Sequence, residues 1–136
     1  STLVQATDAN KITLKAWIDR NIGASGPTNF RAAFEKAWEV VDATNASSGC
    51  NRIMLFLSDG APQQWSAADT QGVGAKAASY DPPMHVLTYG LGEFAKADDL
   101  KAIACRGNGI YYSVTADTLA NTMASYFQVW IARLDG

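Results

Sequence analysis

The sequence predicts an α/β fold in which a parallel β-sheet is covered by helices. Short apolar runs typical of buried strands occur at residues 53–57, 84–89 and 110–114. Between and around them lie longer segments whose apolar residues recur at helical spacing. Because strands and helices alternate along the chain, parallel strands joined by helical connections are favoured. Three strands make a thin sheet for the helices that accompany them.

The composition fits a globular domain and argues against several other classes of protein. The chain has 136 residues, of which 48% are hydrophobic and 18% are charged, with a net charge of −2. It has no cluster of Lys and Arg that would indicate a nucleic-acid partner. It also has no apolar run of the roughly 18 residues that a membrane span needs. Because the chain starts at Ser1 without a signal-peptide pattern, we interpret residues 1–136 as one partial domain of a longer protein.

Two amphipathic helices are predicted in the first third of the chain. The first covers about residues 9–22 and ends at a Gly- and Pro-containing turn. The second opens at Thr28 or Asn29, either of which can cap a helix, and ends near Ala43. Their apolar faces comprise Leu14, Trp17, Ile18 and Ile22 in the first helix, and Phe30, Phe34, Ala37, Trp38 and Val41 in the second.

The strand at residues 53–57 is predicted to be the central one. Its five apolar residues run without interruption, which is typical of a strand buried on both faces. Ser58, Asp59 and Gly60 follow directly. Open α/β sheets bind ligands at the carboxyl ends of their strands. Asp59 is therefore the leading candidate for a functional carboxylate.

Three more helices complete the predicted fold. The one at residues 66–80 contains Gly72 and Gly74, which are expected to weaken it by about 1 kcal/mol each. A short helix follows the second strand, and a long regular helix, capped by Thr115 or Asp117, follows the third. The apolar positions are Leu100, Ile103 and Ala104 in the short helix, and Leu119, Met123, Tyr126, Phe127, Trp130 and Leu134 in the last.

Asp59 and Thr28 are candidate metal ligands, because both are predicted at the same end of the sheet. A carboxylate and a hydroxyl are hard oxygen donors that suit Mg²⁺ or Ca²⁺. Two protein groups can supply only part of the coordination shell of such a cation. In the alternative interpretation, Thr28 caps a helix and Asp59 caps a turn, and spacing alone leaves both interpretations open.

Other chemistries find less support in the sequence. His85, the only histidine, lies inside a predicted strand and is interpreted as structural. The chain lacks a G-x-S-x-G elbow, a phosphate-binding loop, a Rossmann glycine set and zinc-ligand spacing. Asp59 could also be a phospho-acceptor, but the Lys that receiver domains carry after a later strand is absent at residues 90–92.

The chain has two cysteines, Cys50 and Cys105, whose number alone does not distinguish a disulfide from two thiols. Asn45-Ala46-Ser47 is an acceptor pattern for N-glycosylation in a predicted surface loop. Together these features favour an extracellular setting.

The ordered motifs resemble the von Willebrand factor type A domain. Residues 26–29 (with Thr28) and residues 53–60 (with Asp59) resemble the second and third parts of its metal-ion-dependent adhesion site. Residues 86–92 resemble the strand that follows in that family. Further pieces are similar to calcium-channel auxiliary subunits of the alpha-2-delta kind and their Cache-domain relatives. These pieces are residues 3–6, residues 50–54, and Ala104-Cys105 with the later tyrosine pair.

The resemblance implies a three-layer, parallel-sheet, Rossmann-like fold whose N-terminal strands precede Ser1. It implies that Thr28 and Asp59 hold Mg²⁺ or Ca²⁺ and that an acidic group of a protein partner completes the shell. The family's first motif, Asp-x-Ser-x-Ser, is absent, so metal binding by this chain alone is expected to be weak. The resemblance also pairs Cys50 with Cys105 in a disulfide.

The function implied is that of a non-enzymatic, adhesion-type binding module. It would belong to a larger extracellular protein, or to one tethered to the membrane elsewhere, such as a channel auxiliary subunit. The alternatives are a degenerate structural A domain without metal and a phospho-acceptor or enzyme domain that uses Asp59.

Overall fold

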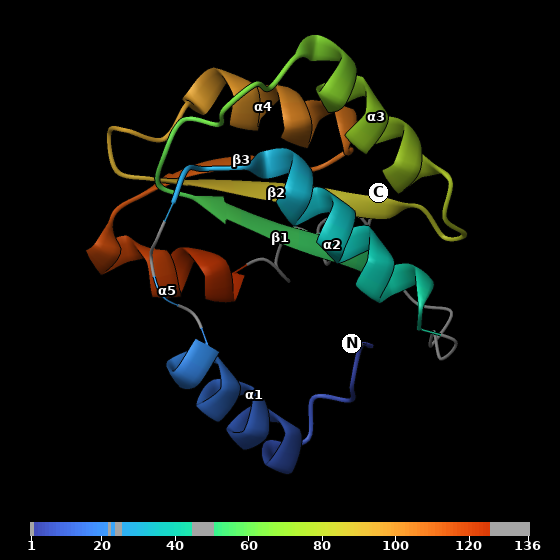
Figure 1. Ribbon diagram of the computed structural model, residues 1–136, viewed down its shortest axis with the longest axis vertical. Coiled ribbons are helices and arrows are strands. Elements are labelled where there is room, and N and C mark those ends of the chain that lie inside the picture. The colour runs from blue at the N-terminus through green and yellow to red at the C-terminus, as the bar shows by residue number, and fades with distance from the viewer. Residues whose placement is uncertain (1, 22, 24–25, 45–50, 126–136) are drawn as a thin grey trace. The chain divides into compact units, whose positions relative to one another are not determined.

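The computed structural model describes residues 2–21, 23, 26–44 and 51–125 (Figure 1). The chain divides into two compact units, residues 1–48 and residues 49–136, which we describe separately. The elements are α1 (Asp8–Asn21), α2 (Phe30–Asp42), β1 (Arg52–Ser58), α3 (Ala67–Ala78), β2 (Met84–Leu91), α4 (Ala97–Arg106), β3 (Tyr111–Val114) and α5 (Ala116–Ala124). None of the helices in these described ranges is long and apolar enough to cross a membrane.

The first unit contains the two predicted helices. α2 begins after Asn29, whose side-chain oxygen accepts a hydrogen bond from the backbone N–H of Ala32 at 3.0 Å. Of the two predicted caps, Asn29 is therefore the one used. Phe30 and Phe34 are buried, as their positions on the apolar face predicted.

α1 confirms the first predicted helix, but none of its residues is buried. The prediction of a helix was correct because the helical spacing of apolar residues is a local property. Ile22, the last predicted member of the apolar face, lies outside the described residues. The large hydrophobic side chains of α1 that are exposed are Ile12, Leu14, Trp17 and Ile18.

The second unit contains a sheet of three parallel strands in the order β1-β2-β3. The predicted parallel α/β arrangement is confirmed, but the prediction that β1 is the central strand, buried on both faces, is wrong. Within the described sheet β1 lies at an edge, and Leu55 and Leu57 are 36% and 41% exposed. β2 is central, and six of its eight residues are buried. An apolar run indicates a strand, whereas its place in the sheet depends on which distant segments pair with it.

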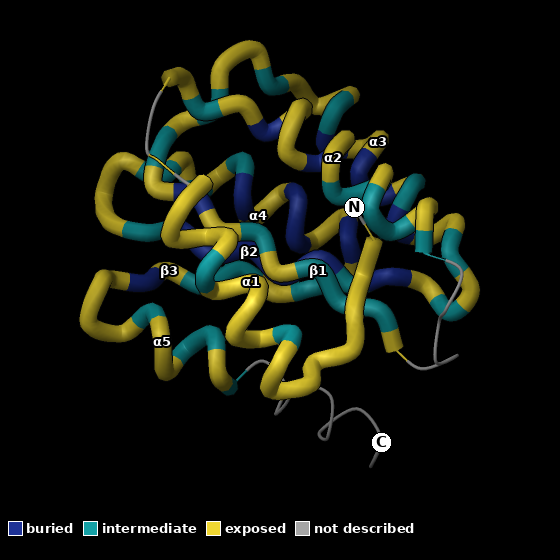
Figure 2. The backbone as a smooth tube through the Cα atoms, turned by 60° about the horizontal axis from the view of Figure 1, so that its bottom comes forward, coloured by how far each residue is buried: buried dark blue, intermediate teal, exposed yellow. Residues whose placement is uncertain are grey.

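Helices cover both faces of this sheet, with α3 and α4 on one face and α5 on the other (Figure 1). Figure 2 shows that the buried segments gather along β2 and along parts of the helices that face it. Thr88 in β2 is fully buried and donates its hydroxyl hydrogen to the carbonyl of Leu100 in α4 at 2.8 Å. The predicted inward positions of α4 are confirmed, because Leu100, Ile103 and Ala104 are all buried.

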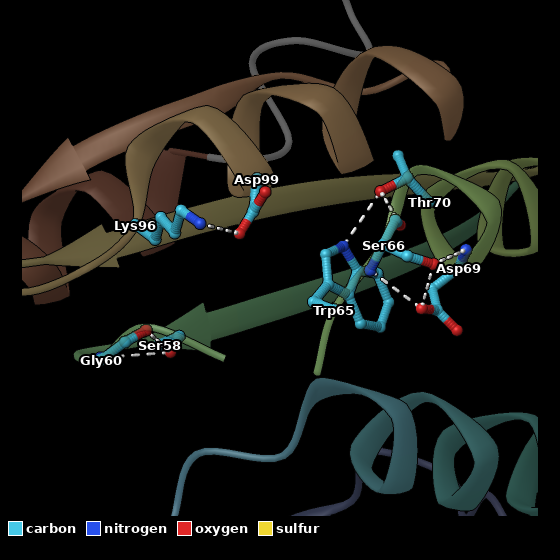
Figure 3. A network of polar contacts seen from close by, with 8 residues as sticks. All are labelled: Ser58, Gly60, Trp65, Ser66, Asp69, Thr70, Lys96 and Asp99. Carbon is cyan, nitrogen blue, oxygen red and sulfur yellow. Dashed lines mark hydrogen bonds and ion pairs between the residues drawn. The ribbon is translucent and has the colours of Figure 1, made fainter. Parts of the chain in front are cut away.

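α3 starts at a capping box. The Ser66 hydroxyl accepts a hydrogen bond from the N–H of Asp69, and the Asp69 carboxylate accepts one from the N–H of Ser66 (Figure 3). The Trp65 indole N–H donates to the Thr70 hydroxyl at 3.0 Å. The two capping-box bonds satisfy backbone donors that the first turn of a helix leaves without partners, so α3 forms in spite of its two glycines.

The two glycines of α3 are expected to respond in opposite ways to substitution. A Cβ atom on Gly74 would lie 2.8 Å from the carbonyl oxygen of Arg106 in α4, whereas one on Gly72 would meet nothing within 4 Å. We expect Gly74→Ala to lower the free energy of unfolding by about 1–3 kcal/mol. Gly72→Ala should raise it by up to about 1 kcal/mol. Urea unfolding of both variants is the measurement, and equal shifts would contradict the close packing of α3 on α4.

Candidate ligand-binding edge of the sheet

Asp59 lies at the carboxyl edge of the parallel sheet. It follows directly after β1, whose last residue, Ser58, is paired with Gly90 near the end of β2. The Asp59 side chain is exposed. Because parallel strands present their carboxyl ends at one edge, the loops after β1 and β2 begin side by side. This edge is the candidate site, and Asp59 is the carboxylate that β1 presents there.

A tight turn at Ser58 sets the course of the chain through Asp59. The Ser58 hydroxyl accepts a hydrogen bond from the N–H of Gly60 at 3.3 Å and donates one to the carbonyl of Gly60 at 3.1 Å (Figure 3). Ser58 is buried, so its hydroxyl is committed to the backbone of its own turn. Asp59, between these two residues, is the side chain that reaches solvent.

Three other acidic groups around this edge serve the helices that start there. Asp69 belongs to the capping box of α3. Asp99, in the first turn of α4, lies 3.5 Å from the ammonium of Lys96 (Figure 3). Asp117 lies in the first turn of α5. Carboxylates in a first turn complement the helix dipole, so these three have a structural explanation that Asp59 does not share.

The loop after β2 adds an exposed aromatic group that the sequence interpretation missed. The N–H of Gly92 donates to the carbonyl of Val114 at 3.0 Å. A Cβ on Gly90 would lie only 3.3 Å from the Cβ of Ala95, so the loop folds back closely over the strand end. Between these two attachments Phe94 is 78% exposed. A Phe between the predicted second strand and the short helix that follows it was the signal available in the sequence.

Thr28 lies in the first unit, one residue before the cap of α2, and is half-buried. Asn29 performs the capping that the alternative interpretation assigned to Thr28. Asp59 belongs to the second unit. The predicted pairing of Thr28 with Asp59 in one metal site therefore stays a prediction.

The described residues meet only part of what a divalent cation requires. Among residues 2–44 and 51–125, apart from positions 22, 24 and 25, no group of three or more His, Cys, Asp or Glu side chains could hold a metal ion. Asp59 offers one hard oxygen ligand, while Mg²⁺ needs near-octahedral coordination and usually keeps several waters. The donor set suits an open, weak site to which water and a second molecule contribute.

Comparison with known protein families and with curated proteins found no match to this chain. The resemblance to von Willebrand factor A domains therefore remains a hypothesis from the motifs. The structure shows a parallel α/β sheet with helices on both faces.

The remaining predicted sites lie partly outside the described residues. Cys105 lies exposed in α4. Cys50 and Asn45 are outside the described residues, so the predicted disulfide and glycosylation stay predictions. His85 lies at the opposite end of β2 from the candidate edge, with its Nδ1 atom 2.7 Å from the carbonyl oxygen of Asn108.

Proposed function

We propose that this chain is a non-enzymatic protein-binding module that uses a divalent cation held at Asp59. The observation that carries the proposal is the exposed Asp59 carboxylate, which directly follows β1 at the carboxyl edge of a parallel sheet. The resemblance of the motifs to an adhesion site supplies the class of function. It also supplies the setting, a larger extracellular or membrane-tethered protein.

Asp59 would provide a carboxylate oxygen to Mg²⁺ or Ca²⁺. Water and an acidic group of the partner protein would supply further oxygen ligands, because both cations prefer such donors. The bound cation would neutralise the two carboxylates and link the partner to the edge. Thr28 is the second protein donor that the motif predicts, and its variant is a separate test.

The side chains of Ser58 and His85 support a binding role better than catalysis. The Ser58 hydroxyl is bonded to its own turn, and His85 lies at the other end of β2. A nucleophile needs a base within hydrogen-bond reach, and these two side chains belong to opposite ends of the sheet.

We expect Mg²⁺ or Ca²⁺ to shift the backbone amide NMR signals of Ser58, Asp59 and Gly60 in the unmodified chain. The dissociation constant should be about 10⁻³ M or weaker, because the protein supplies few ligands. Asp59→Asn should abolish these shifts, since an amide lacks the charge that attracts the cation. Asp81→Asn is the matched control, because Asp81 is also exposed but precedes β2 at the opposite edge.

Three outcomes would each contradict a different part of the proposal. Absence of metal-dependent shifts at residues 58–60 in the unmodified chain would remove Asp59 as a metal ligand. Unchanged binding of a protein partner by Asp59→Ala at saturating Mg²⁺ would separate binding from the cation. An unaltered metal titration in Thr28→Ala would remove Thr28 from the site and leave Asp59.

A further inference from the structure

We propose that Asn108 is a site of deamidation, a covalent modification by water that the folded turn suppresses and that opening of the turn permits. Asn108 is exposed and is the only asparagine of the chain that is followed by glycine. It lies in the turn between α4 and β3, at the opposite edge of the sheet from Asp59. The modification is therefore independent of the proposed metal-dependent function.

The reaction joins the side chain of Asn108 to the backbone of the next residue. The backbone nitrogen of Gly109 loses its proton and bonds to Cγ of Asn108, the bond from Cγ to Nδ2 breaks, and ammonia leaves with that proton. Water then opens the cyclic imide to aspartate or to isoaspartate, in which the main chain runs through the side chain. Because glycine has no side chain, its backbone nitrogen is open to close approach.

Asn108 is the left-handed residue of a Schellman motif that ends α4. Its N–H donates to the carbonyl of Cys105 at 3.3 Å, and the N–H of Gly109 donates to the carbonyl of Ala104 at 2.8 Å. Asn108 accordingly has a φ of 50°, which asparagine tolerates better than most residues. In this conformation the nitrogen of Gly109 is turned away from the side chain of Asn108, so the peptide group between them must rotate before the two can react.

Hydrogen bonds hold both ends of the peptide group that must rotate. Its N–H, that of Gly109, is bonded to Ala104 in α4. Its carbonyl, that of Asn108, accepts a hydrogen bond from Nδ1 of His85 at 2.7 Å. Both bonds must break before the nitrogen can turn toward Cγ and give up its proton. His85, the only histidine of the chain, thus restrains the reaction from its position in β2.

The folded turn has no room for isoaspartate. A Cβ atom on Gly107 would lie 2.6 Å from Cβ of Val86, and one on Gly109 would lie 2.0 Å from the carbonyl oxygen of Val86. The N–H of Val86 also donates to the carbonyl of Gly107 at 3.0 Å. Isoaspartate adds one main-chain atom between these two glycines, so at least one of the close contacts with β2 must open. The modification would therefore mark irreversibly those chains whose turn has opened.

Peptide mapping of the unmodified 136-residue chain by mass spectrometry, after incubation at neutral pH with and without urea, tests the proposal. Asn121 is the internal control, because it is exposed but is followed by Thr122, whose branched side chain hinders the attack. In urea, Asn108 should deamidate while Asn121 stays intact. Without urea, deamidation of Asn108 should be at least about tenfold slower, since an opening that costs about 1.4 kcal/mol already lowers the reactive population tenfold.

The variant His85→Phe tests the restraint that His85 applies. The folded variant should deamidate at Asn108 about two- to tenfold faster than the unmodified chain, the range for the loss of one hydrogen bond. In urea, where the bond is absent, the two chains should react at the same rate. A folded variant that reacts no faster than the unmodified chain would contradict this role of His85.

Two results for the unmodified chain would overturn the proposal without any variant having to fold. Failure of Asn108 to deamidate faster than Asn121 in urea would remove the site. Equal rates at Asn108 with and without urea would show that the folded turn gives no protection. After removal of urea, chains with isoaspartate at position 108 should unfold at a lower denaturant concentration than chains with asparagine. Equal midpoints would contradict the close fit of the turn against Val86.

Discussion

Gly109→Ala is expected to lower the free energy of unfolding by about 3 kcal/mol or more, the upper end of the cost of overpacking. A Cβ atom at this position would lie 2.0 Å from the carbonyl oxygen of Val86 in β2 and 2.6 Å from its carbonyl carbon. Both are backbone atoms of the central strand and cannot move aside as a flexible side chain would. The Gly109 N–H also donates to the carbonyl of Ala104 at 2.8 Å, which holds the turn against the end of α4.

Chemical denaturation followed by circular dichroism measures this loss. Gly72→Ala is the matched control, because it adds the same methyl group where nothing lies within 4 Å. Its midpoint should stay the same or rise. If Gly109→Ala unfolded at the same denaturant concentration as the unmodified chain, the turn after α4 could not approach β2 as closely as it does in the structure.

The helices and strands could be predicted from the sequence because their signals are local. The apolar run at residues 53–57 became β1, and the helical spacing at Leu100 and Ile103 became the buried face of α4. The ends of the helices were less certain. Thr28 and Asn29 are both good caps and are adjacent, so only the observed hydrogen bond to Ala32 distinguishes them.

Features that depend on distant residues could not be predicted in this way. β1 has the composition of a central strand, but its position at an edge depends on where β2 and β3 pair. Gly74 was expected only to weaken a helix. In the structure its small size allows the backbone of Arg106, 32 positions later in the chain, to pack closely against α3. Neither the edge position of β1 nor the close packing at Gly74 can be inferred from the residues that neighbour them in the sequence.

The candidate site was predictable in part, because the position of Asp59 follows from a local signal. An acidic residue directly after a buried-type strand lies at the carboxyl edge of a parallel sheet, and Asp59 does so. The exposure of Phe94 was not predictable, because it follows from the attachment of Gly92 to Val114 and of Ala95 to Gly90. The three-dimensional course of a loop, not its composition, decides which of its side chains reach a ligand.

Leu100→Ala is expected to lower the free energy of unfolding by about 2–5 kcal/mol, the range for a leucine removed from a packed core. Leu100 is fully buried, and its carbonyl accepts the hydroxyl of the buried Thr88. The truncation leaves a cavity between α4 and β2, where the surrounding side chains can relax only in part. Urea unfolding of the variant and of the unmodified chain measures this difference.

Leu57→Ala is the matched control, since the same atoms are removed from a side chain that is 41% exposed. Its cost should be well below that of Leu100→Ala, because part of the leucine already contacts water. A cost at Leu57 as large as that at Leu100 would contradict the partial exposure of Leu57 in the structure.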